Sequence, residues 1–173
     1  MTKYSTIAFS KKQANRSNII GMRATYGLTI LNLKEEYPEI TVFTADTSTS
    51  AGLDRFKTSY PESFIDCGIS EQCMVASAAG YVSSGGTALA STFAPFLMLR
   101  AAEQVRLSLG YMNLPLIITG LASGVSLGYL GYTHCCVEDL PFALSIPNIY
   151  VYSPSDAYEI KLVLPEIIKK RRP

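Results

Sequence analysis

Apolar and polar positions along the chain repeat with two periods, and each period predicts one kind of element. Within residues 17–36, Ile20, Ala24 and Leu28 recur at helical spacing. Pro38 then marks the end of that helix. Similar patterns predict further helices over 70–84, 93–110 and 155–170. Short runs rich in β-branched and aromatic residues predict five strands, over 40–44, 63–66, 87–91, 114–119 and 148–152.

The predicted helix over 93–110 follows the third strand directly. Its spacing places Phe96, Leu99 and Val105 toward the core. Arg100 and Arg106 fall on the partly exposed side.

The order of these elements predicts the fold class. Short apolar strands separated by helices are typical of a mainly parallel sheet covered on both faces, so we expect a three-layer α/β/α fold. Residues 1–16 are expected to form a polar N-terminal segment and residues 17–173 to form the domain. In such folds ligands bind beyond the carboxyl ends of the strands, which points to the loops at 45–52, 67–71, 91–96 and 120–136.

Composition and charge exclude several classes of protein. The 173 residues are 48% apolar and 17% charged with a net charge of +1, which excludes a mainly disordered chain and an overall electrostatic affinity for nucleic acid. No apolar run approaches the ~20 residues of a membrane helix, and the N-terminal residues lack the apolar run of a secretory signal. We therefore expect a cytoplasmic protein with neither nucleic acid nor membrane as a partner. The basic run 169–172 fits a solvated helix end, with a nucleic-acid or membrane tail as the alternative.

Several common signatures are absent or incomplete. The sequence has no P-loop and no GxGxxG dinucleotide motif. Residues 124–128 match the GxSxG pattern of hydrolases, but the single histidine, His134, follows with no acidic residue between, so the triad order is missing. The four cysteines, at 67, 73, 135 and 136, form no CxxC pair, and the single histidine cannot complete a zinc-finger type of site with them. We therefore expect reduced thiols and no metal site.

Residues 64–74 combine a strand, a turn and a helix start around one acidic residue. The strand ends in Asp66, Gly68 allows the turn, and the helix opens at Ser70. Glu71 therefore lies in the first helical turn, where the helix dipole favours an acid by about 0.3–1 kcal/mol. Taken alone, the segment is explained by helix capping.

The segment is part of a longer series of motifs, whose joint order resembles the pyrimidine-binding domain of transketolase and related thiamin-diphosphate enzymes. The pieces are Arg23-Ala24, Ala45-Asp46 with Ser50, Phe64–Gln72, Ala78–Gly80, Ser91–Phe96, Gly131–His134, Glu138-Asp139, Ile146–Asn148 and Tyr152–Asp156. The resemblance covers nearly all of the chain from about residue 20 onward. It implies the thiamin-diphosphate-binding fold, with three α/β/α layers and a mainly parallel sheet.

The resemblance implies cofactor-binding roles for four residues. In the family, a carboxylic acid supplies a proton to the ring nitrogen N1′ of the cofactor's aminopyrimidine, and Glu71 holds that position. Burial disfavours the ionised carboxyl whereas the helix N-terminus favours it, and the mechanism requires burial to prevail. Phe93 and Phe96 match aromatic residues that stack on and flank the aminopyrimidine. Asp46 lies in the loop that approaches the thiazolium ring.

Three further residues match positions on the substrate side. His134 matches a catalytic histidine that binds substrate hydroxyls near the reacting carbon, and Ser50 lies in a loop that approaches the substrate. Arg23 matches an arginine that holds the substrate's phosphate. Each residue type also has an ordinary explanation. Phe93 and Phe96 fit an aromatic core pair, Asp46 and Ser50 fit turn chemistry, and Arg23 fits a helix-surface charge.

Three positions depart from the family's pattern. Leu130 stands where transketolases usually have an aspartate that contacts a substrate hydroxyl, Ala122 where they have a second substrate histidine, and Ser153 where an arginine is expected. These losses of polar and cationic groups indicate a different donor or acceptor, less phosphorylated than the usual one. The form Gly128–His134 resembles the split transketolase-like proteins of unusual-sugar pathways.

These motifs predict the pyrimidine-binding subunit or fragment of a transketolase-like transferase that moves a two-carbon ketol unit between sugars. The family's GDG motif, which binds the diphosphate of thiamin diphosphate through Mg²⁺, does not occur here. We therefore expect a partner N-terminal subunit that carries the metal, in a homodimer or heterotetramer. The alternatives are a non-catalytic structural or regulatory subunit of the same fold, and a related enzyme such as a deoxyxylulose-phosphate synthase.

Overall fold

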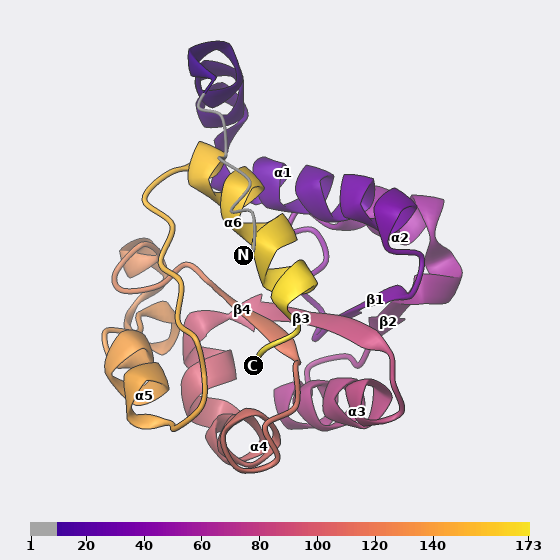
Figure 1. The fold of residues 1–173 in the computed structure, drawn as a ribbon. Helices are drawn as coiled ribbons and strands as arrows, with labels where there is room; N and C mark the ends of the chain where they lie inside the picture. The colour runs from indigo at the N-terminus through magenta and orange to yellow at the C-terminus, as the bar shows by residue number, and fades with distance from the viewer. Residues whose placement is uncertain (1–9) are drawn as a thin grey trace, which may run out of the picture.

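The computed structural model describes residues 10–173 and contains one central sheet with helices on both faces (Figure 1). The helices are α1 (Lys11–Glu36), α2 (Asp54–Ser59), α3 (Glu71–Ser83), α4 (Ala102–Val105), α5 (Asp139–Ser145) and α6 (Ala157–Lys170). The strands are β1 (Ile40–Thr44), β2 (Phe64–Asp66), β3 (Thr87–Phe93) and β4 (Ile117–Leu121). Within this part of the chain, no helix is both long and apolar enough to span a membrane.

All pairings in the sheet are parallel, in the order β2-β1-β3-β4. The register aligns Thr44 with Asp66 on one side and with Ser91 on the other, and Ser91 with Thr119. The four carboxyl ends therefore meet at one edge of the sheet. The expected mainly parallel sheet is confirmed, and the loops that follow these strands are placed together.

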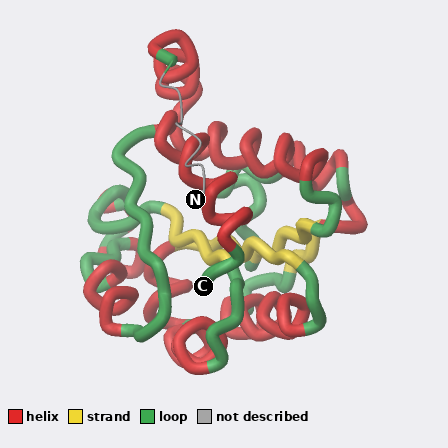
Figure 2. Tube along the Cα trace, in the orientation of Figure 1, coloured by secondary structure: helices red, strands yellow, loops and turns green. Residues whose placement is uncertain are grey.

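Strand residues alternate between two apolar clusters, one on each face of the sheet. Val42 and Leu89 pack with α1 and α6, in a cluster that also contains Ile30, Leu33, Leu164 and Ile168. Phe43 and Ala90 pack on the opposite face with α3 and the 96–111 segment, in a cluster that also contains Met74, Val75, Leu97 and Val105. Figure 2 shows the strands as a band between the two helical layers. The three-layer α/β/α prediction is confirmed.

The predicted fifth strand over 148–152 is wrong. Asn148 has a φ of 70°, in the left-handed region, which turns the chain at the point where a strand should begin. The Tyr150 N–H donates to the carbonyl oxygen of Pro173 at 2.9 Å, and a cavity separates this segment from β4. Residues 148–152 therefore run past the edge of the sheet without joining it. The fourth strand lies at 117–121, later than the predicted 114–119.

The chain after β3 is not the regular helix predicted over 93–110. It contains α4 between two π-helical segments, Phe96–Arg100 and Arg106–Tyr111. A π-turn holds one residue more than an α-turn, so the predicted inward face is rotated. Leu99 is 48% exposed, against the prediction, and Leu97 is buried in its place, whereas Val105 is buried as predicted.

The N-terminal helix begins earlier than expected. Ser10 caps α1 through a hydrogen bond from Gln13 N–H to its hydroxyl, so residues 11–16 are helical. Gly21, with a φ of 83°, breaks α1 into two parts, and the first part projects from the body of the domain (Figure 1). The remainder of the predicted polar segment, residues 1–9, lies outside the described residues.

Candidate active site

One carboxylate organises the two loops that lead to the candidate acid. Asp66, the last residue of β2, accepts hydrogen bonds at Oδ1 from the backbone N–H of Asp46 (2.9 Å) and of Gly68 (3.0 Å). Gly68 takes a φ of 65°, and its carbonyl accepts from Ser70 N–H at 2.7 Å. This tight turn starts α3 at Glu71, directly beyond the carboxyl end of the sheet.

Glu71 is the most deeply buried acid near this edge. Its side chain is 2% exposed, and Oε2 accepts a hydrogen bond from Arg100 Nη1 at 2.7 Å. A carboxylate removed from water requires such a partner, because unpaired burial of a charge is strongly unfavourable. Oε1 makes no hydrogen bond to any residue that the structure describes. One oxygen of a buried acid is thus held while the other is left for a further group.

Two aromatic rings and the single histidine lie next to this ion pair. The ring centroids of Phe93 and Phe96 are 6.0 Å apart, and that of His134 is 5.8 Å from the first and 5.4 Å from the second, all edge-to-face. The Arg100 guanidinium carbon lies 4.3 Å from the Phe96 ring centroid. A continuous row of contacts therefore runs from His134 through Phe96 and Arg100 to Glu71.

The loop after β4 folds back to bring His134 to the rings. Gly124 and Cys136 form an antiparallel bridge with N–H···O distances of 2.8 and 2.7 Å, which closes the loop at its base. Nδ1 of His134 lies 3.0 Å from the hydroxyl of Thr133. This contact leaves Nε2 of the imidazole available to another group.

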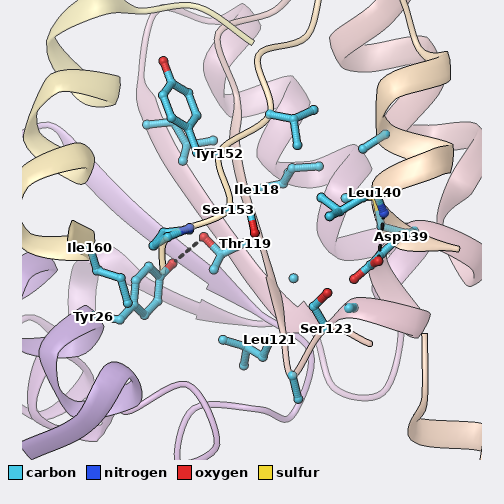
Figure 3. Close-up of a pocket in the computed structure, with 18 of the residues that line it drawn as sticks. Tyr26, Ile118, Thr119, Leu121, Ser123, Asp139, Leu140, Tyr152, Ser153 and Ile160 are labelled. Atoms are coloured by element: carbon cyan, nitrogen blue, oxygen red, sulfur yellow. Dashed lines mark hydrogen bonds between the residues drawn. The ribbon is translucent and has the colours of Figure 1, made fainter. Parts of the chain in front are cut away.

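A second group of predicted residues lines a cavity of about 800 Å³ beside β4 (Figure 3). Arg23, Ser50 and Phe93 are among its lining residues. Its walls are mostly apolar and come from β4, α5, α6 and the 149–154 segment. The positions that depart from the family's pattern also line it: Ala122, Leu130 and Ser153. Phe93 is shared between this cavity and the row of rings.

The predicted site residues are therefore gathered in two connected groups, with one exception. Glu71, Phe93, Phe96 and His134 form one group, and Arg23 and Ser50 belong to the cavity. Asp46 is exposed, with a left-handed φ of 56°, and lies in neither group.

Two residues of this site were missed from the sequence. Arg100 was expected to be partly exposed, which is confirmed, but its contact with Glu71 spans 29 residues of sequence. The only sequence feature that linked Arg100 to the site was its four-residue offset from Phe96, since side chains at that offset share a helix face. Asp66 was recognised as the end of a strand and not as the acceptor that joins two loops.

The donor set suits a planar heteroaromatic group better than a metal ion. Among residues 10–173, no three His, Cys, Asp or Glu side chains are placed to hold a metal. The free oxygen of the buried acid can pair with a basic ring nitrogen. The two neighbouring aromatic rings can pack against the ring that carries this nitrogen. The aminopyrimidine of thiamin diphosphate is such a ring.

Several proteins with similar sequences are named as transketolases or as parts of them. A Methanocaldococcus jannaschii protein named "Putative transketolase C-terminal section" is 35% identical over 153 residues, which are 88% of this chain and 48% of that protein. One subunit of the apulose-4-phosphate transketolase of Phocaeicola vulgatus is 30% identical over 91% of this chain and 50% of its own length. The chain thus spans about half the length of these relatives.

A solved structure and a family model agree with these relatives. The structure described as "Split gene transketolase, inactive beta4 tetramer" superimposes with a TM-score of 0.76 at 34% identity, over 86% of this chain and 48% of the other. Residues 19–173 match the family model "Transketolase, pyrimidine binding domain", which includes every motif from Arg23 to Asp156. With the buried acid and the aromatic rings in the same domain, the chain belongs to the transketolase family and carries its pyrimidine-binding domain.

Proposed function

We propose that this chain is the pyrimidine-binding part of a thiamin-diphosphate-dependent transketolase that transfers a two-carbon ketol unit between sugars. The observation that carries the proposal is the buried Glu71, with one carboxylate oxygen held by Arg100 and the other available. In the transfer, a carbon–carbon bond of the donor ketose breaks and a new one forms to the acceptor's aldehyde carbon, so no oxidant or reductant is consumed. Thiamin diphosphate, when bound, supplies the carbon nucleophile that this chemistry requires.

Glu71 is the proposed catalytic acid. Its Oε1 shares a proton with the ring nitrogen N1′ of the aminopyrimidine, while Arg100 holds Oε2. Because the side chain is 2% exposed, water competes poorly for this hydrogen bond. A buried acid facing a basic nitrogen is the arrangement that favours a short, charge-assisted contact.

The rings orient the cofactor and His134 faces the substrate. Phe93 and Phe96 provide an aromatic surface for a planar ring, worth about 0.5–1.5 kcal/mol beyond the buried area. His134, fixed by its contacts with both rings, offers Nε2 to a substrate oxygen. Asp46 remains proposed as a cofactor contact, through a loop that a partner's binding surface can reach.

The cavity beside β4 is the proposed substrate side. Arg23 offers a cation at its mouth, and Ser50 offers a hydroxyl. Leu130, Ala122 and Ser153 leave the wall short of the polar groups usual in the family. We therefore propose a sugar or sugar phosphate other than the common pentose and hexose phosphates. Apulose 4-phosphate, named for one relative, is a first candidate.

The proposed enzyme needs a second polypeptide or domain. This chain contributes the acid and the rings, and a transketolase N-terminal subunit holds the diphosphate and Mg²⁺. The related split-gene structure is described as an inactive tetramer, which supports the need for such a partner. Ile69 and Tyr132, 77% and 85% exposed beside the site, are the kind of apolar surface that a partner covers. A homodimer of such pairs, or a heterotetramer, is the proposed assembly.

The test is co-expression with a diphosphate-binding transketolase subunit, to be sought in the reading frames that neighbour this chain's gene. Ketol transfer is assayed over a panel of sugars with the wild type and with Glu71→Gln. We expect Glu71→Gln to assemble normally and to lose at least about a hundredfold in turnover, the usual contribution of a general acid. Glu62→Gln, at an exposed position, is the control. Wild-type rates in Glu71→Gln would refute the proposed role.

The same assay addresses the alternatives. A non-catalytic subunit, which Leu130, Ala122 and Ser153 favour, predicts no ketol transfer with any sugar. A deoxyxylulose-phosphate synthase predicts turnover with pyruvate as the donor instead of a ketose. Calorimetry on the chain alone should detect little affinity for thiamin diphosphate, because the diphosphate site belongs to the partner.

A further inference from the structure

We infer that Arg100 is a positioning residue for Glu71, presented by a π-helical turn that also carries Phe96. The inference rests on the proposed function of Glu71 and adds a residue to which the sequence assigned no role. It concerns how the buried carboxylate is kept in one orientation, so that a single oxygen faces the aminopyrimidine.

The first observation is the asymmetry of the ion pair. The Glu71 side chain is 2% exposed whereas that of Arg100 is 46% exposed. The arginine thus enters from the solvent side and donates from Nη1 to Oε2 at 2.7 Å, a distance typical of a charge-assisted hydrogen bond. Among residues 10–173 the structure contains one side-chain ion pair, and that pair involves the proposed acid.

The second observation is the contact that fixes the arginine itself. Its guanidinium carbon lies 4.3 Å from the centroid of the Phe96 ring, close enough for a cation–π interaction. A guanidinium is planar and can stack on a ring while it donates in its own plane, which an ammonium cannot do. The two contacts together leave Arg100 little freedom, although almost half of its side chain faces solvent.

The third observation is the helical turn that makes both contacts possible. Ala101 N–H donates to the carbonyl oxygen of Phe96 at 3.1 Å, a five-residue span that defines a π-turn. In this wider turn, residues four apart lie one above the other. Phe96 and Arg100 therefore share one face, while Leu97 and Ala101 are buried and Leu99 is exposed. Single π-turns inside helices are frequently found at functional sites.

These contacts connect the acid to the ring on which the cofactor would stack. Any shift of Phe96 moves the guanidinium, and with it the Oε2 atom of Glu71. Without Arg100, the buried carboxylate would have no cation among its hydrogen-bond partners and would be free to reorient toward solvent. Arg100 thereby keeps Oε1 directed to the place where the aminopyrimidine nitrogen is proposed to bind.

The test compares Arg100→Met, Arg100→Lys, Glu71→Gln and the double variant, with Arg106→Met as the control on the same segment. The first readout is thermal unfolding of the full 173-residue chain. We expect Arg100→Met to lower the midpoint by several degrees and the double variant to recover most of that loss, since a neutral amide needs no cation. Arg106→Met should leave the midpoint unchanged.

The second readout is thiamin diphosphate affinity in the complex with the diphosphate-binding subunit, measured by calorimetry. Arg100→Met should weaken binding about tenfold, the loss of one charge-assisted hydrogen bond, and Arg100→Lys should restore part of it. In the Glu71→Gln background, Arg100→Met should change the affinity less than twofold. Such coupling is the signature of a residue that acts through Glu71.

Two outcomes would overturn the inference. Additive effects of Arg100→Met and Glu71→Gln on affinity would mean that Arg100 acts independently of the acid. Unchanged unfolding and affinity in Arg100→Met would mean that the ion pair has no role. The proposed function fails by a different result, wild-type turnover in Glu71→Gln, so the two failures are distinguishable.

Discussion

A Cβ atom on Gly27 of α1 would lie 1.9 Å from the carbonyl oxygen of Gly52, so the loop after β1 rests directly on the backbone of α1. Gly52 has a φ of 72°, and a Cβ there would lie 2.5 Å from the carbonyl oxygen of Arg23. Both glycines are required by close approach, and Gly52 also by its left-handed conformation. These contacts hold Ser50 and Arg23 at the same cavity.

We predict that Gly27→Ala destabilises the chain although alanine favours helices. The added methyl group meets backbone atoms, which cannot rotate away, and overpacking of this kind costs about 1–3 kcal/mol. Gly80→Ala is the matched control, because a Cβ on that helical residue meets nothing within 4 Å. It should stabilise by about 0.5–1 kcal/mol. Urea unfolding of both variants checks this, and a change of the same sign in both would contradict it.

A second prediction concerns Asp66, which joins the loops after β1 and β2. Asp66→Ala removes the acceptor of the Asp46 and Gly68 N–H groups, and should cost about 1 kcal/mol per hydrogen bond. Asp66→Asn keeps a side-chain oxygen and should retain most of the stability. Hydrogen exchange at the two amides should accelerate in the alanine variant. Equal exchange rates in both variants would show that the Oδ1 contacts do not order these loops.

The fold was largely predictable because it depends on local patterns. The four parallel strands and the three layers follow from short apolar strands that alternate with helices along the chain. In the structure these strands are buried between helices on both faces of the sheet. The prediction failed where a single backbone conformation decides the outcome. Asn148 adopts a left-handed φ, so an apolar strand-like segment leaves the sheet. The π-turn at Phe96–Arg100 adds one residue, which no 3.6-residue pattern includes.

The site was predictable in its residue types and less so in its contacts. The motifs located Glu71, Phe93, Phe96 and His134, and the structure brings them into one row. The partner of Glu71 was not predictable, because the ion pair links two elements 29 residues apart and nothing local requires it. Their roles in catalysis stay predictions, which the variants above test.

A third prediction concerns the pH dependence of stability. Burial raises the pKa of the Tyr26 hydroxyl above its ordinary value of 10.0, and hydrogen bonds with Ser91 (2.6 Å) and Thr119 (2.9 Å) oppose that rise in part. The folded state therefore holds this proton more tightly than the unfolded chain. Its contribution to stability is complete below pH 10 and is lost as the pH rises above it.

The Tyr26→Phe variant separates the contribution of the hydroxyl's hydrogen bonds from that of its ionisation at high pH. Near pH 7 it should lose about 1–2 kcal/mol, because the partner hydroxyls lose a buried hydrogen bond. Above pH 10 its stability should fall less steeply than that of the wild type. Tyr129→Phe, at a position 82% exposed, is the control and should change neither value. Parallel pH profiles for the wild type and Tyr26→Phe would contradict the assignment.

The last prediction tests whether the cavity wall selects the substrate. Leu130 lines the cavity and is 46% exposed, so an aspartate at this position remains solvated and should fold without difficulty. Leu130→Asp restores the acceptor that transketolases usually present to a substrate hydroxyl. We expect kcat/KM for the common ketose phosphates to rise about tenfold, the worth of one hydrogen bond to a charged group. The best substrate of the wild type should gain nothing, since its recognition does not use that acceptor. Leu144→Asp, 72% exposed on α5 and outside the cavity lining, is the matched control, because it adds the same charge away from the proposed site. An equal gain in both variants would mean that net charge and not the cavity wall determines the choice of sugar.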